Sequence, residues 1–106
     1  MSTHAEIMTI DRIDRRYYSN INHALVDKAK TLADGIRVMV GVANMRMKQD
    51  VISTSDRNAV FIADNDVSDK NCCVASMKTM NAALVLKVKE MEKTMDSLTN
   101  FACSGL

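Results

Sequence analysis

The last third of the chain carries an apolar repeat whose spacings alternate between three and four residues. The repeated positions are Val74, Met77, Asn81, Leu84, Val88, Met91, Met95, Leu98 and Ala102. This spacing, kept over four heptads, indicates a helix that packs along its length against another helix. The one polar member, Asn81, falls at an a position, where a buried amide sets the register of a helix pair at some cost in stability.

The composition favours helices throughout. The 106 residues include no Pro, three Gly and nine Met, and only four aromatic residues. Little in such a chain interrupts a long helix, and Met-rich apolar faces are common in helical bundles and in groove-type binding surfaces. We therefore predict an all-α protein, a helical hairpin or small bundle with a C-terminal coiled-coil helix. The length suits one domain.

The expected organisation is a single helical domain over 1–106. An N-terminal helix or pair of helices covers about 4–49, a polar turn and a short apolar segment cover 50–71, and the coiled-coil helix covers 72–102. The two long helices are expected to fold back as an antiparallel hairpin or to join a bundle. The first helix either restarts at Ser19-Asn20 or runs straight through it.

The middle segment, residues 50–71, fits more than one arrangement. Residues 50–58 hold a dense cluster of Ser, Thr, Asp and Asn, which predicts the main turn. The run Ala59–Ala63 fits either a helical turn or a short strand. Residues 64–71 form a second loop, with Ser68 or Asp69 capping the last helix, or belong to a longer helix from about 56.

The function favoured by the pattern is non-enzymatic. We predict a helical assembly or interaction protein. It would be either a structural subunit of a filament, a secretion apparatus or a phage-type assembly, or the dedicated chaperone of such a subunit. Its partner is itself or another helical protein. Helices that pack within one chain have the same spacing, so the repeat could instead be buried inside the chain's own bundle. The predicted contact residues are Val74, Met77, Met80, Asn81, Leu84, Val85, Val88, Met91, Met95 and Leu98.

A second reading is a small nucleic-acid-binding regulator. Its contacts are Arg12, Arg15, Arg16, Tyr17 and Tyr18, because guanidinium groups and aromatic rings recognise phosphates and bases. Acidic residues stand among these arginines, and the net charge of the chain is only +1. The basic cluster is therefore the weaker of the two predictions.

The sequence predicts no catalytic, cofactor or metal site. Asp64-Asn65-Asp66 resembles the start of a calcium loop, but Asp69 stands where Gly is needed and Ala75 where the bidentate Glu is needed. Cys72 and Cys73 lack a C-x-x-C spacing. His23 and Asp27 make a helical i,i+4 pair without a nucleophile. We accordingly expect a protein that is not an enzyme.

The expected location is cytoplasmic by default. The chain has three cysteines, an odd number without a C-x-x-C spacing, which predicts reduced thiols. The polar N-terminus lacks the apolar region of a signal peptide. No apolar stretch is long enough for a membrane span. Export by a route that needs no cleaved signal leaves no mark in the sequence, so it stays open.

Overall fold

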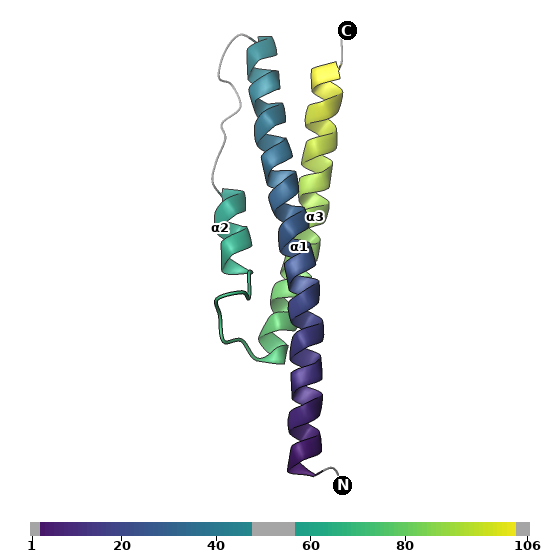
Figure 1. The fold of residues 1–106 in the computed structure, drawn as a ribbon. Coiled ribbons are helices and arrows are strands. Elements are labelled where there is room, and N and C mark those ends of the chain that lie inside the picture. Colours follow the sequence, from purple (N-terminus) through teal and green to yellow (C-terminus); the bar gives the residue numbers. More distant parts are fainter. Residues whose placement is uncertain (1–2, 48–56, 104–106) are drawn as a thin grey trace.

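The computed structural model describes residues 3–47 and 57–103. Within these ranges the chain forms three helices and no strand: α1 (His4–Met47), α2 (Arg57–Asp64) and α3 (Val74–Cys103). The predicted all-α class is confirmed, and the long helices α1 and α3 pack against each other (Figure 1). The overall extents are 67 × 21 × 15 Å. A helix of 44 residues is about 66 Å long, so α1 alone spans the long axis.

α1 begins with a capping box. The Thr3 hydroxyl accepts the Glu6 N–H at 3.2 Å, and the Glu6 carboxylate accepts the Thr3 N–H at 3.1 Å. These two bonds satisfy donors that the first helical turn leaves without partners. The helix then runs unbroken through Ser19-Asn20 to Met47, which settles the alternative of two N-terminal helices in favour of one.

α1 and α3 run in the same direction. The Arg46 guanidinium, near the end of α1, donates to the carbonyls of Phe101 and Ala102 at the end of α3. Earlier in both helices, Asn22 bonds Asn81. The antiparallel hairpin considered from the sequence is therefore wrong in direction. Figure 1 shows the reason that a parallel pair is reachable: the chain returns along the pair through α2 before α3 begins.

A buried asparagine pair joins three segments of the chain. Asn22 Nδ2 donates to Asn81 Oδ1 at 2.9 Å and to the carbonyl of Asn65 at 2.8 Å, while Asn22 Oδ1 accepts the Val67 N–H at 3.1 Å. Asn81 Nδ2 donates to the Tyr18 carbonyl at 3.0 Å. Both amides are buried and satisfied, which makes them tolerable in an apolar interface.

The Asn22–Asn81 bond also defines the register of α1 against α3. Counting from it, Lys28 is at a g position and Glu92 at the e position five residues further along the partner helix. Their side chains form an ion pair at 3.1 Å, the pairing typical of parallel coiled coils. Both side chains are about half exposed, so the ion pair favours the parallel orientation of the helices but contributes little to the free energy of unfolding.

The core lies where α2 covers the α1–α3 seam. Ile62 of α2 is buried with Val26, Ala29, Leu84, Val88 and Met91. Residues 59–63 are therefore helical rather than a strand. Lys70 donates to the carbonyls of Ala63 and Asp64 and so caps the end of α2. The second loop lies between α2 and α3; most of the turn predicted at 50–58 lies outside the described residues.

Cys73, and neither Ser68 nor Asp69, stands at the N-cap of α3. Its carbonyl accepts the Met77 N–H at 3.0 Å, and its Sγ lies 3.2 Å from the Ser76 hydroxyl. Ser68 instead donates its N–H and its hydroxyl to Asp66 Oδ1. This Asx turn engages Ser68 within the loop, so the helix begins later than the polar sequence predicted.

We expect Leu84→Asp to lower the free energy of unfolding by about 4 kcal/mol or more, because it places an unpaired charge in the seam. Leu84 is 0% exposed. Leu86→Asp is the matched control, since Leu86 is 69% exposed on the same helix, and it should change stability by about 0.5 kcal/mol at most. Urea denaturation followed by far-UV circular dichroism measures both. Equal losses for the two variants would contradict the structure.

We expect Asn22→Ala to cost about 2–4 kcal/mol, and at least about 1 kcal/mol more than Asn81→Ala. Removing the Asn22 amide deprives Val67, Asn65 and Asn81 of their partner, whereas Asn22 keeps its bonds to the loop when Asn81 is shortened. The same denaturation experiment ranks the two variants. The reverse order would show that the loop bonds contribute little.

Candidate functional site

Half of the predicted contact residues are buried inside the chain. Met77, Asn81, Leu84, Val88 and Met91 face α1 and are covered by it. Val74, Met80, Met95 and Leu98 are half-buried, and only Val85 is exposed. The central part of the repeat is therefore engaged within the chain. That leaves the margins of α3 available to a partner, and self-association through them stays a prediction.

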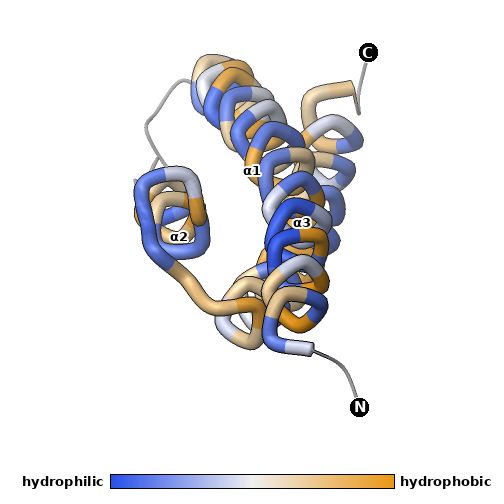
Figure 2. Tube along the Cα trace, turned by 60° about the horizontal axis from the view of Figure 1, so that its bottom comes forward, coloured by the Kyte–Doolittle hydropathy of each residue, from blue (hydrophilic) through white to orange (hydrophobic). Residues whose placement is uncertain are grey.

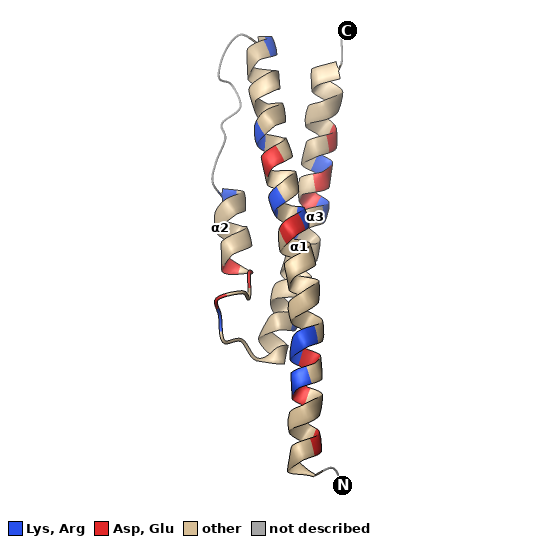
Figure 3. Cartoon of the chain, in the orientation of Figure 1, with Lys and Arg blue, Asp and Glu red and all other residues tan. Residues whose placement is uncertain are grey.

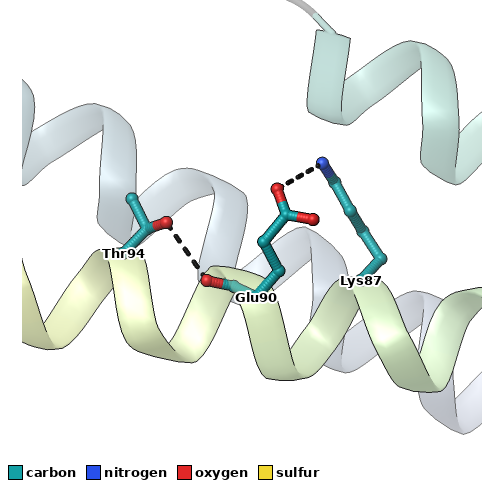
Figure 4. A network of polar contacts seen from close by, with 3 residues as sticks. All are labelled: Lys87, Glu90 and Thr94. Carbon is teal, nitrogen blue, oxygen red and sulfur yellow. Dashed lines mark hydrogen bonds and ion pairs between the residues drawn. The ribbon is translucent and has the colours of Figure 1, made fainter.

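Charged side chains on α3 make local and intrachain contacts. Lys87 Nζ lies 3.2 Å from Glu90 Oε1, and the Thr94 hydroxyl donates to the Glu90 carbonyl, as Figure 4 shows. Lys87 also lies over the ring of Phe61 in α2, at 5.4 Å from the centroid. Glu92 pairs with Lys28 of α1, so this g–e ion pair forms within one chain.

The N-terminal arm, residues 4–14 of α1, projects beyond the helix pair. In the register set by Asn22 and Asn81, the first residue of α3 lies level with Arg15 (Figure 1). The arm is therefore about 16 Å of single helix. An isolated helix of this length is marginal in water, since most helical stability in proteins comes from packing.

The arm is nonetheless rich in large apolar side chains. Ile7, Met8, Ile10 and Ile13 are all exposed, Ile7 at 56% and Ile13 at 62% of their surface. Tyr17 follows them at 59%, with its ring edge-on to that of Tyr18 at 5.0 Å between centroids. In Figure 2, where the lower end of Figure 1 comes forward, apolar segments continue along α1 towards the N-terminus. These residues form the candidate interaction site.

The basic cluster is divided among several partners. Arg15 Nε lies 3.0 Å from Asp11 Oδ2, and Tyr18 is half-buried beneath the Lys78 ammonium. Arg12, Arg16 and Tyr17 remain together along an open hollow of about 540 Å³ on α1. The structure thus gathers three of the five residues predicted for nucleic-acid contact and engages the other two elsewhere.

Charged residues occur in bands along the two long helices (Figure 3). One band lies near the N-terminal end of α1, up to Arg16, and a second lies in the middle of α1 beside the charged stretch of α3. Between the bands, residues 17–26 of α1 carry no Asp, Glu, Lys or Arg. The uncharged stretch coincides with the asparagine pair and the start of the core.

The residues that the sequence analysis weighed as metal or catalytic groups lie apart from one another or are hydrogen-bonded within their own segment. In the former calcium-loop candidate, the Asn65 amide donates to the Phe61 carbonyl at 2.9 Å. Hydrogen bonds from the Ser68 hydroxyl and N–H lower the pKa of Asp66. His23 and Asp27 are both exposed on α1. Over residues 3–47 and 57–103, no three His, Cys, Asp or Glu side chains are placed to hold a metal ion.

Asn22 is the residue that sequence reasoning missed. Its neighbour Ile21 is apolar and attracts attention first, whereas Asn22 is the residue that lies in the seam. A signal was present, since Asn22-x2-Leu25-x3-Ala29-x2-Leu32-x3-Ile36 repeats the spacing of Asn81-x2-Leu84-x3-Val88-x2-Met91-x3-Met95. Two segments with an amide at the same phase of the same repeat indicate a parallel pair with the two amides side by side.

Comparison with known proteins found no match to a protein family, a curated protein or a solved structure. None of the described helices combines the length and the apolar character that crossing a membrane requires.

Cys73 is the most activated thiol that the structure describes. Hydrogen bonds from the Ser76 hydroxyl and the Ser76 N–H lower its pKa below the ordinary value of 9.0. The backbone N–H groups at the start of α3 point towards it, and a helix N-terminus favours a thiolate. Cys103, at the other end of α3, is also exposed.

We expect Cys73 to react with iodoacetamide faster than Cys103 at pH 7 to 8, because the Ser76 hydrogen bonds lower the pKa of Cys73 and Cys73 is fully exposed. Ser76→Ala should raise the pKa of Cys73 and move the midpoint of its pH–rate profile upward, while leaving Cys103 unchanged. Mass spectrometry of peptides after timed alkylation measures both rates. An unshifted Cys73 midpoint in the variant would contradict the role of Ser76.

Proposed function

We propose that this protein is a non-enzymatic helical assembly or interaction protein that packs the exposed apolar face of α1 against a helix of another chain. The observation that carries the proposal is the N-terminal arm. It presents Ile7, Ile10 and Ile13 to solvent on a helix that nothing else in the described chain supports. Burying such side chains against a partner gives roughly 1.5–3 kcal/mol for each, before the costs of association.

The location of the apolar face agrees with this role. The rest of α1 is stabilised by α3 and α2, so the arm continues from a helix that is already formed and needs no nucleation of its own. Packing against a partner then stabilises an arm that is marginal alone, at a lower ordering cost than for a separate segment. Structural subunits and chaperones of helical assemblies both work through apolar contact of this kind, and the proposal covers either.

A nucleic-acid-binding regulator is the second candidate. It rests on Arg12, Arg16 and Tyr17, which lie together along one side of α1. The two functions differ in their response to salt. Phosphate contacts weaken steeply as salt rises, whereas apolar association holds or strengthens.

Amide hydrogen exchange of the dilute chain tests the proposal. We expect the amides of residues 4–14 to exchange about 100-fold or more faster than those around Val26 and Ala29, because only the latter lie in a packed core. Ile10→Glu should leave both rates nearly unchanged in the monomer but reduce the binding of an apolar dye. Thr9→Glu, which adds the same charge on the neighbouring exposed position, is the matched control and should retain dye binding.

Strong protection of residues 4–14 in a chain of monomeric mass would overturn the proposal. It would mean that the arm packs within its own chain and that no free apolar face exists. Equal dye binding by the Ile10→Glu variant and the Thr9→Glu control would also count against it.

A further inference from the structure

α1 carries a second heptad stripe, most of which the described helices leave uncovered. We call it the outer stripe: every seventh residue from Ile7 to Val42, together with every seventh from Ile10 to Met45. Its spacings alternate strictly between three and four residues. Members such as Ile21 precede seam residues such as Asn22 by one position, so the outer stripe is rotated about 100° from the seam.

The outer stripe is open to solvent over most of its length. Its large apolar members include Ile7, Ile10, Val38, Val42 and Met45, all of which are exposed, Met45 at 80%. α2 lies on another side of α1, beside Lys30 and Ala33. The stripe combines apolar positions with Asp14, Lys28, Thr31 and Gly35, and two of these already contact α3, Lys28 through Glu92 and Gly35 through Met95. Its exposed apolar members are left uncovered by the described helices and suit a second helix.

We propose that a second copy of this chain covers the outer stripe, with its own α1 lying antiparallel to the first. The inference rests on the proposed function and names the partner helix. Two charged members of the stripe, Asp14 and Lys28, decide the direction. A parallel pair in register would set each against its own like charge, whereas an antiparallel pair does not.

The same two residues select the register. In an antiparallel pair, residues that face each other have numbers with a constant sum, and here the sum is 45. Asp14 then faces Thr31 of the second copy, a hydrogen-bonding partner. Lys28, whose ammonium pairs with Glu92 of its own chain, faces the ring of Tyr17 of the second copy, where a cation–π contact can add to that ion pair.

The apolar layers match in the same register. Ile7 faces Val38 of the second copy, and Ile21 faces Ala24 on either side of the two-fold axis. Ile10 faces Gly35, which has no side chain of its own. There the methyl of Met95 from α3 lies 3.0 Å from where a Cβ would stand, so the surface that Ile10 meets is apolar.

Neighbouring registers are worse. Sliding the second copy by one heptad in either direction sets both Asp14 and Lys28 against aliphatic side chains, where a buried charge is costly. Each unfavourable contact would occur twice by symmetry. The register with the sum of 45 also lays the N-terminal arm of each copy along the second half of the other α1, so both arms gain the support that they lack alone.

Disulfide trapping tests this geometry in a full-length background with Cys72, Cys73 and Cys103 replaced by Ser. Ile7→Cys and Val38→Cys lie on one straight helix about 46 Å apart, so no bridge can form between them within one chain. After the two single variants are mixed and oxidised, we expect a cross-linked species of twice 11.8 kDa. Either variant oxidised alone should remain a monomer on a denaturing gel.

Three results would overturn the inference. Self-cross-linking of Ile7→Cys would indicate a parallel pair. Stronger cross-linking of Ile7→Cys to Met45→Cys than to Val38→Cys would indicate another register. A monomeric mass by light scattering up to millimolar concentration would exclude a second copy. In that last case, fast exchange of residues 4–14 would leave the proposed function standing, and slow exchange would remove both.

Discussion

The hydrogen bond between Asn22 and Asn81 is the interaction on which the rest of the structure depends. Apolar side chains in a seam tolerate several registers and both directions, because dispersion contacts are not directional. A buried amide is tolerated only in a register and direction that give it a hydrogen-bond partner. Pairing these two amides makes α1 and α3 parallel, brings Lys28 to Glu92, and leaves Asn22 free to hold the loop before α3 through Asn65 and Val67.

That register also divides α1 into two parts, the N-terminal arm and the part that packs against α3 and α2. Because α3 begins level with Arg15, no described helix supports the first part of α1, while the rest is packed by α3 and α2. One long helix thus carries both the core and the candidate site. Substitutions in the core should lower the stability of the chain, whereas substitutions in the arm or along the outer stripe should alter its association. Stability and association can therefore be changed separately.

The sequence predicted the parts of the structure that periodicity encodes. The repeat from Val74 to Leu98 gave the length and the buried side of α3, and Asn81 was expected at a buried seam position, where it lies. An antiparallel hairpin was the direction considered for the two long helices, and the parallel direction was not predicted, because a heptad repeat has the same spacing in both. Asn22 was missed because a search for apolar residues passes over an amide, and the arm's exposure became visible only once the register was known.

The parallel arrangement has a consequence for how the chain folds. In an antiparallel hairpin, contacts next to the turn form first and the rest close in sequence at little entropic cost. Here the α1–α3 contacts join residues 55 to 63 positions apart at both ends of the pair. Pairing of α1 with α3 therefore cannot spread residue by residue from a turn between them, and its first encounter must close a long loop. Long-range pairing of this kind makes folding slower than it would be for an antiparallel hairpin of the same two helices.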